Sequence, residues 1–269
     1  NQIIKDLLIN SSLTQILNNY LETSKKINSE VFMRIYRVLY SLYNNCFNLD
    51  LELYKSIFKI FSKPLYKFRI NELIKYSLDI LLMLSKIKEK EIANCFNDLN
   101  LFDALNNIIF KRGIKGNEIT VTIILEIFCN IVEKGNKEFQ KIIVNSGKMA
   151  IFYNNLLAKY KKEKISIDYF TEASIIITLN NLLIFNPENM VKYIMTEGKE
   201  ILNYCLESAK SVFHDTRQFG INFLHNALID NQNQINLEIL YDIANIALDT
   251  LNINKFTNCY FLCIQSVYL

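Results

Sequence analysis

The sequence has no tryptophan and few of the residues that build tight turns, with 6 glycines and 2 prolines among 269 residues. Sheet-rich and α/β proteins need many turns, and these turns use glycine and proline. Their scarcity therefore favours long helices joined by few breaks. Histidine is also scarce, since His214 and His225 are the only two. Neither has a cysteine or acidic partner at a metal-ligand spacing, so the sequence predicts no metal site and no cofactor.

No charge of one sign dominates, because 30 basic and 27 acidic residues leave a net charge of +3. A nearly balanced chain has no strong attraction to nucleic acid or to a membrane surface. The most apolar run, residues 175–185, is shorter than the roughly 20 residues that a membrane span needs. A hydrophobic content of 51% permits a large buried core. We therefore expect protein partners, with no direct nucleic-acid contact and no membrane span.

The six cysteines contain no Cys-x-x-Cys pair, and most of them lie on apolar helical positions. A free cysteine at such a position behaves as a small hydrophobic residue. This usage predicts a reducing compartment, the cytoplasm or the nucleus. The chain begins at Asn1 without methionine and ends at Leu269 inside an apolar pattern, so we expect both ends to be truncated.

One pattern of helices and breaks recurs along the chain. Residues 127–147 predict the end of a long helix, a break at 135–136, a short helix and a second break at 146–147. Similar starts of medium helices follow Ser12, Asp50, Asn100, Gly147, Gly198 and Asn236, with spacings of 38, 50, 47, 51 and 38 residues. Armadillo and HEAT repeats have periods of about 40–47 residues. The sequence predicts an all-α, right-handed superhelical solenoid of about five to six units, forming a single domain over residues 1–269.

The hydrophobic periodicity also predicts individual helices and the breaks between them. Lys63 and Pro64 are expected to end the helix that begins at residue 51, and Gly113 and Gly116 to separate two helices. Pro187 is expected at a first helical position, and Asp215 or Thr216 as a helix cap. The predicted long helices are 30–45, 70–87, 119–133, 168–183 and 219–228, and the medium ones are 13–22, 51–61, 101–111, 148–159 and 201–209.

Three segments resemble the armadillo family, and importin-α within it. The family's long helix ends in a leucine, a small residue and an asparagine, followed by a turn, a short helix and a glycine. Phe128-Cys-Asn130 with Gly135 and Gly147 is similar to this pattern, as is Leu179-Asn-Asn181 with Gly198. Residues 217–227, which contain Asn226, resemble the long helix alone. The sequence departs from importin-α because it lacks the tryptophan array that packs against the lysine side chains of a bound peptide.

The resemblance implies a function and a set of contact residues. In importin-α-like proteins the asparagine faces a concave groove and hydrogen-bonds to the backbone of an extended peptide. The matching residues here are Asn130, Asn181 and Asn226, and the positions one turn earlier add Glu126 and Asn222 as candidates. Two other repeats have Ser41 and Ser85 at the asparagine position. The other interpretation, which stays open, is that some of these asparagines only cap helices or connect neighbouring ones.

No catalytic group is predicted, since no serine or cysteine has a paired base and no glycine-rich phosphate loop occurs. The sequence therefore favours a non-catalytic scaffold or adaptor that binds an extended protein segment, with nuclear transport as one role that the resemblance implies. Two alternatives stay open: a structural subunit of a large assembly and a chaperone cofactor of armadillo type. Arg34 and Arg37 could contact an acidic ligand, although a Glu30–Arg34 pair within one helix explains Arg34 equally well.

Overall fold

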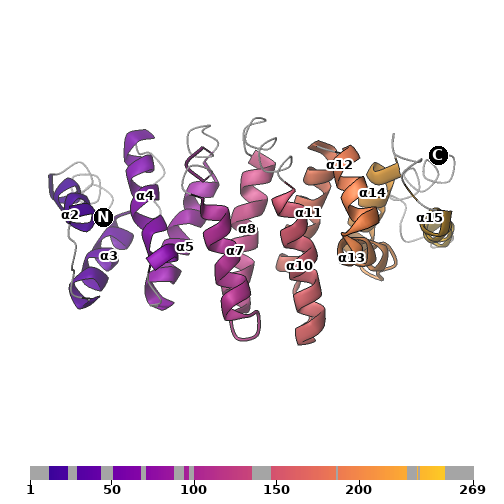
Figure 1. Cartoon of the computed structure of the whole chain (residues 1–269), viewed down its shortest axis with the longest axis horizontal. Coiled ribbons are helices and arrows are strands. Elements are labelled where there is room, and N and C mark those ends of the chain that lie inside the picture. The colour runs from indigo at the N-terminus through magenta and orange to yellow at the C-terminus, as the bar shows by residue number, and fades with distance from the viewer. Residues whose placement is uncertain are drawn as a thin grey trace. The chain divides into compact units, whose positions relative to one another are not determined.

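The computed structural model describes ten stretches of the chain (Figure 1): residues 12–23, 29–43, 51–67, 71–87, 94–96, 100–134, 147–185, 187–228, 235 and 237–251. Within these stretches all regular secondary structure is helical. The prediction of an all-α fold is therefore confirmed. The breaks and short helix predicted between residues 135 and 146, and the helix predicted after residue 254, lie outside the described residues.

The chain divides into two compact units, Asn1–Asn136 (unit 1) and Lys137–Leu269 (unit 2). Each unit is described by itself below. The single repeat domain expected over residues 1–269 stays a prediction.

Unit 1 consists of two rows of helices that pack against each other. Helices α2, α4 and α7 follow one another in the first row, and α3, α5 and α8 follow one another in the second. Helix α4 also packs against α5, and α2 against α3, which joins the rows. The bounds are α2 Ser12–Thr23, α3 Ser29–Tyr43, α4 Leu51–Lys67, α5 Asn71–Ser85, α7 Leu101–Arg112 and α8 Glu118–Lys134.

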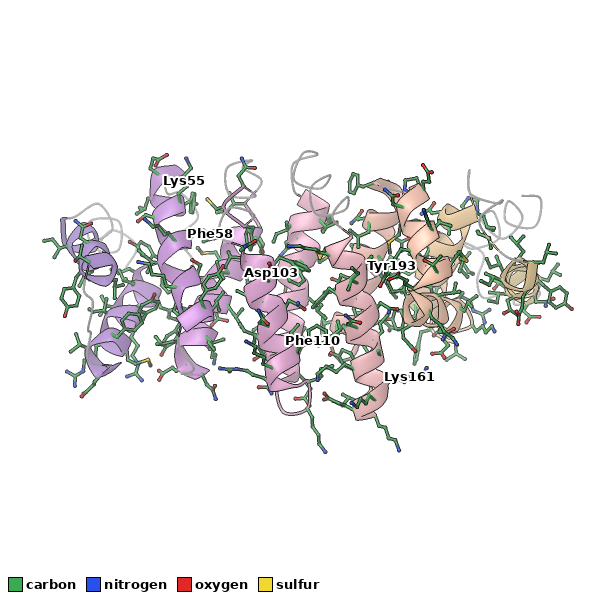
Figure 2. The ribbon with its side chains drawn as sticks, in the orientation of Figure 1. Lys55, Phe58, Asp103, Phe110, Lys161 and Tyr193 are labelled. Atoms are coloured by element: carbon green, nitrogen blue, oxygen red, sulfur yellow. The ribbon has the colours of Figure 1, made fainter. Side chains whose placement is uncertain are left out.

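The core of unit 1 lies between the rows and is rich in aromatic rings. Phe58 of α4 is fully buried, and its ring centroid lies 4.5 Å from that of Phe96. Lys55, one turn earlier on the same helix, is only partly buried and pairs with Glu52 (Figure 2). Lys59, the residue after Phe58, is exposed, so α4 has a buried apolar side and an exposed polar side, as the sequence pattern predicts.

Pro64 does not end α4, so the predicted break at Lys63–Pro64 is wrong. The helix continues from Leu51 to Lys67 with Pro64 inside it. Proline has no N–H, so it cannot donate to the carbonyl of Ile60 four residues earlier. The hydroxyl of Tyr36, from α3, donates to this carbonyl at 2.6 Å. A residue of the neighbouring helix therefore satisfies the group that proline leaves without a partner, and the helix can continue.

Tyr36→Phe should lower the free energy of unfolding by about 1–3 kcal/mol, because a buried carbonyl then loses its donor. Pro64→Ala restores a backbone N–H to the same carbonyl, so Tyr36→Phe should cost clearly less in that background. Urea unfolding of the wild type, both single variants and the double variant gives the coupling energy. An equal cost of Tyr36→Phe in both backgrounds would show that Tyr36 does not compensate for Pro64.

The predicted break between α7 and α8 is confirmed. Gly113 and Gly116 have φ of 83° and 78°, a backbone conformation that residues with a Cβ rarely adopt. The N–H of Gly113 donates to the carbonyl of Ile109 at 3.0 Å and closes the last turn of α7. Two glycines therefore reverse the chain within five residues of the end of α7.

Unit 2 repeats the arrangement in two rows. Helix α10 packs against α13 in one row and α11 against α14 in the other, while α12 packs against α11, α13 and α14. Pro187 is the first residue of α12, as predicted. The bounds are α10 Lys148–Glu163, α11 Tyr169–Phe185, α12 Pro187–Thr196, α13 Lys199–Ala209, α14 His214–Leu228 and α15 Leu237–Leu251.

Helix α10 is longer than predicted. It continues past residue 159 to Glu163, and Lys159 pairs with Glu163 at 2.9 Å across its last turn. Lys161 lies near this end of the helix (Figure 2) and reaches the carboxylate of Glu200 at 3.2 Å. Lys164, the residue after the end of the helix, has the left-handed conformation with φ of 54°.

Helix α14 begins earlier than predicted, at His214, so neither Asp215 nor Thr216 is its cap. Thr216 instead donates its hydroxyl to Glu172 of α11 at 3.1 Å. The side chain of Ser211 accepts the N–H of Phe213, just before the helix, at 3.2 Å. Thr216 therefore lies inside the first turn of α14 and contacts a neighbouring helix, which the local sequence does not reveal.

Asn154 connects successive repeats of unit 2. Its side-chain oxygen accepts the backbone N–H groups of Glu200 and Ile201 at 3.0 and 3.4 Å, at the start of α13. The first N–H groups of a helix have no partner within the helix. A side chain of α10 therefore caps α13, the equivalent helix of the next repeat.

Arg217 is buried at the junction of three helices, with only 7% of its surface exposed. Its guanidinium donates to the carbonyls of Ser211 and Lys210 at 2.9 and 3.1 Å, just past the end of α13, and to the hydroxyl of Thr250 in α15 at 3.3 Å. A cation is favoured near a helix C-terminus because the last carbonyls carry partial negative charge. Arg217 therefore joins α13, α14 and α15.

Gly220 is the point of closest approach between α13 and α14. A Cβ at this position would lie 2.3 Å from the backbone nitrogen of Ala209 and 2.8 Å from its Cα. Both are backbone atoms of α13, so no side chain can move aside. The two helices can pack this closely only because residue 220 is glycine.

Gly220→Ala should lower the free energy of unfolding of the protein by about 1–3 kcal/mol, because the helices must separate to admit the methyl group. This loss should exceed the gain of about 1 kcal/mol that alanine brings over glycine inside a helix. Thermal and urea unfolding measure the effect. The control is Asn107→Ala on the exposed side of α7, which should change stability by less than about 0.5 kcal/mol. A Gly220→Ala protein as stable as the wild type would contradict the close approach.

Candidate protein-binding site

Asn130, the first predicted contact residue, connects two long helices of unit 1. Its side-chain amide donates to the hydroxyl of Ser85 in α5 at 3.1 Å, and the residue is only 7% exposed. Ser85 in turn donates to the carbonyl of Leu82 at 2.7 Å. The sequence assigned Ser85 and Asn130 to equivalent positions of successive repeats, and this contact agrees with that alignment. Asn130 therefore has the connecting role that the sequence left open for these asparagines.

Glu126, one turn before Asn130, pairs with Lys86, the residue after the end of α5, at 3.1 Å. The Glu126 and Lys86 side chains are 42% and 48% exposed, so the pair lies at the surface. Such pairs stabilise a fold by at most about 1 kcal/mol. The carboxylate of Glu126 is therefore both accessible and already neutralised.

A polar cluster between α3 and α5 was not predicted as a unit. Arg37 donates through Nε and Nη2 to one carboxylate oxygen of Glu72 at 2.9 and 2.6 Å. The hydroxyl of Tyr76 donates to the same oxygen at 2.6 Å. Tyr40 donates to Asp79 at 3.2 Å, and its ring centroid lies 4.6 Å from that of Tyr76. The acidic partner of Arg37 is therefore on the next long helix of the same chain.

Of the two interpretations given for Arg34, the ion pair within its own helix is the one that the structure shows. Arg34 contacts Glu30, four residues earlier in α3, at 2.6 Å. The sequence suggests this pair directly, because it depends only on helical spacing. Arg37 and Glu72 lie 35 residues apart, so only the packing of α3 against α5 brings them together.

Asn181, Asn222 and Asn226 lie on neighbouring long helices of unit 2. The contacts Glu172–Thr216 and Tyr169–Asp215, at 3.1 and 3.4 Å, link residues 44 and 46 positions apart and set the register of α11 against α14. Asn181 and Asn226 are 45 residues apart, so we infer from this register that they occupy matching positions of the two helices, and Asn222 lies one turn before Asn226.

These three amide side chains are half-exposed. None of them makes a hydrogen bond with another residue in the described part of the chain, in contrast to Asn130. Gln218, one turn before Asn222 on the same face of α14, shares both properties, although the sequence did not single it out. The feature of the sequence that could have identified Gln218 is its spacing of four residues from Asn222. Within unit 2, then, a set of amides remains open to a partner.

No family model and no curated protein sequence matches the chain. Solved structures of designed proteins do match it. An engineered protein of the Northeast Structural Genomics Consortium has a TM-score of 0.66 and 14% identity; the match covers 94% of this chain, which spans 58% of that protein's length. The designed armadillo repeat protein YIII(Dq)4CqI has a TM-score of 0.64 and 11% identity over 94% of this chain and 98% of its own. The fold is that of armadillo repeats.

A second designed armadillo repeat protein, YIII(Dq.V1)4CPAF, was solved in complex with the peptide (KR)4. Its TM-score is 0.62 with 12% identity, and the match covers 94% of this chain and 98% of that one. At this level of identity the likeness shows the armadillo-like fold and does not extend to importin-α in particular.

Two other kinds of site were sought in the described residues. In these stretches, no three histidine, cysteine or acidic side chains come close enough together to hold a metal ion. Among the described helices, none combines the length and the apolar character that crossing a membrane requires.

Glu72 should make stability depend on pH. The hydrogen bonds from Tyr76 and Arg37 lower the pKa of Glu72 in the folded protein. Its contribution is therefore fully present above the unfolded pKa of about 4.3 and is lost as pH falls through the lower folded pKa. Glu72→Gln should flatten the fall in Tm between about pH 5 and about pH 3.

The matched control for this experiment is Glu52→Gln, whose ion pair with Lys55 lies within α4 alone. Glu52→Gln should keep the acid dependence of the wild type. If Tm falls equally with pH in Glu72→Gln and in the wild type, the protonation of Glu72 does not reduce the stability of the fold as predicted.

Proposed function

We propose that the protein is a non-catalytic scaffold or adaptor that binds an extended segment of another protein on the exposed faces of its long helices. The observation that carries this proposal is the set of amides Asn181, Asn222 and Asn226, which the described part of unit 2 leaves unbonded. An extended chain presents backbone N–H and C=O groups at every second residue. An amide side chain both donates and accepts, so it can pair with either group.

The residues predicted in unit 1 would contribute differently. Asn130 is bonded to Ser85, so its main effect on a partner would be to keep α5 and α8 in register. Glu126 is exposed enough to accept a hydrogen bond from a partner while it remains paired with Lys86. Support for a peptide ligand also comes from the similar fold of the designed protein bound to (KR)4.

The compartment and the pathway are part of this proposal. The free cysteines Cys95, Cys129 and Cys205 support a reducing compartment, the cytoplasm or the nucleus. A role in nuclear transport has only the resemblance to importin-α in its favour. A fluorescent fusion expressed in the source cells distinguishes these two compartments.

A structural subunit of a larger assembly is the second candidate. It is favoured by large apolar side chains exposed away from the amides, since Val212, Phe213 and Leu237 are 83%, 72% and 84% exposed. Contiguous exposed apolar surface is a common sign of a protein interface. In this case the partner should contact the α13–α14 connection and the start of α15, and loss of the amides should not matter.

The double variant Asn181→Ala, Asn226→Ala tests the proposed function. It should weaken binding to the partner by about tenfold or more, as expected when two buried hydrogen bonds are lost. Its Tm should stay close to that of the wild type, because neither amide bonds to the described chain. The partner is first recovered by affinity capture with wild-type full-length protein, and its affinity for both forms is then measured by titration calorimetry.

Asn107→Ala is the matched control, since it removes an exposed amide from a different helix. Equal affinity of the double variant and of this control would reject the amides as the binding site. Loss of binding in Val212→Lys, with the double variant unaffected, would favour the structural subunit.

A further inference from the structure

Helix α11 has apolar residues on all of its sides. Its sequence from Tyr169 to Phe185 contains a single charged residue, Glu172, in the first turn. A helix of this kind is normally covered on all sides. Nevertheless, Phe170 and Ile184 are 74% and 59% exposed, and Ile177 is half-exposed. These three residues are spaced by seven, close to two turns, so they lie on one side of the helix together with Asn181.

The matching side of α14 carries amides instead of charges. Gln218, Asn222 and Asn226 are spaced by four, about one turn, and all three are half-exposed. The two basic residues of the same stretch, Arg217 and His225, are each only 7% exposed. Burial also lowers the pKa of His225, which keeps its ring neutral near pH 7.

These residues form a surface that we call the uncharged face. It consists of Ile177, Asn181 and Ile184 of α11 and Gln218, Asn222 and Asn226 of α14. The contacts between α11 and α14 hold the two helices in register, so the aliphatic and amide side chains lie next to each other. Glu172 and Asp215, the acidic residues of these helices, both lie in their first turns.

We propose that the uncharged face binds an extended segment whose side chains are uncharged, with aliphatic or aromatic residues at alternate positions. This proposal rests on the proposed function and adds the chemistry of the partner. Side chains of an extended chain alternate in direction, so every second one can pack on Ile177 and Ile184 while the backbone meets the amides. The segment would supply the apolar cover that α11 lacks.

Charge is the reason to exclude lysine-rich, arginine-rich or acidic segments from this face. A charged group brought against apolar side chains loses hydration and needs an opposite charge to offset the loss. Beyond their first turns, the exposed sides of α11 and α14 contain no charged residue. The long helices of unit 1, in contrast, carry charged residues on their partly exposed sides, namely Glu72, Asp79 and Glu126.

The test uses the full chain and three labelled eight-residue peptides in fluorescence anisotropy titrations. The peptides are alternating Lys-Arg, alternating Glu-Asp, and an uncharged one that alternates Ser or Thr with Leu or Val. The uncharged peptide should bind at least about tenfold more tightly than either charged one. Its Kd should change less than about twofold between about 50 mM and about 500 mM salt, because no ion pair is formed.

A charge placed on the face should abolish this preference. Ile184→Lys should weaken binding of the uncharged peptide by about tenfold or more. Ile119→Lys, which changes an exposed aliphatic residue in the first turn of α8, should alter it less than about twofold. Circular dichroism of both variants checks that the helices are intact.

The outcomes separate this proposal from the proposed function. If a charged peptide binds most tightly and the Asn181→Ala, Asn226→Ala variant loses it, the scaffold function stands and the uncharged specificity is wrong. If none of the peptides binds, both proposals fail. If sedimentation shows self-association that Ile184→Lys abolishes, a second copy of the chain covers the face, and the proposed ligand is wrong.

Discussion

In the described part of the chain, the helices of each repeat pack against one another and against the helices of neighbouring repeats, and the rest of the structure depends on this packing. Packing alone would leave neighbouring helices free to slide, so polar contacts are needed to set their register. Each unit contains such a contact between long helices, because Ser85–Asn130 and Glu172–Thr216 join residues 45 and 44 positions apart. In these two contacts the separation along the chain is close to one repeat length.

The two units use their long helices differently. In unit 1, the polar groups on these helices are largely occupied by each other, as in the cluster of Arg37, Glu72 and Tyr76. In unit 2, the corresponding faces carry amides and aliphatic side chains that the described chain leaves open. One architecture thus presents two surfaces of different chemistry.

Much of the fold could be predicted from local patterns. Helical periodicity gave the long helices to within a few residues, except the start of α14, and glycines with positive φ marked the break between α7 and α8. The failures share one cause. Pro64 stays within α4, where Tyr36 supplies the missing donor, and Thr216 lies inside the first turn of α14, where its hydroxyl bonds to Glu172 instead of capping the helix. Both outcomes depend on a residue of another helix. That residue is too far away along the chain for rules based on neighbouring residues to include it.

Motif alignment gave Asn130, Asn181 and Asn226 as candidate contact residues, and their role in binding stays a prediction. It could not tell that Asn130 bonds to Ser85 while Asn181 and Asn226 stay open, because the same residue type fits both roles. Nor could it give the cluster around Glu72, whose members come from two helices.

The contact between Tyr36 and Ile60 also bears on where the chain can be shortened. Helix α4 belongs to one repeat, but its last turns depend on a hydroxyl from the repeat before it. A shortened protein that starts at residue 51 would contain every residue of α4 but would lose the tyrosine that donates to the Ile60 carbonyl, leaving only water to replace it. A shortened form that includes α4 keeps this hydrogen bond only if it also retains α3.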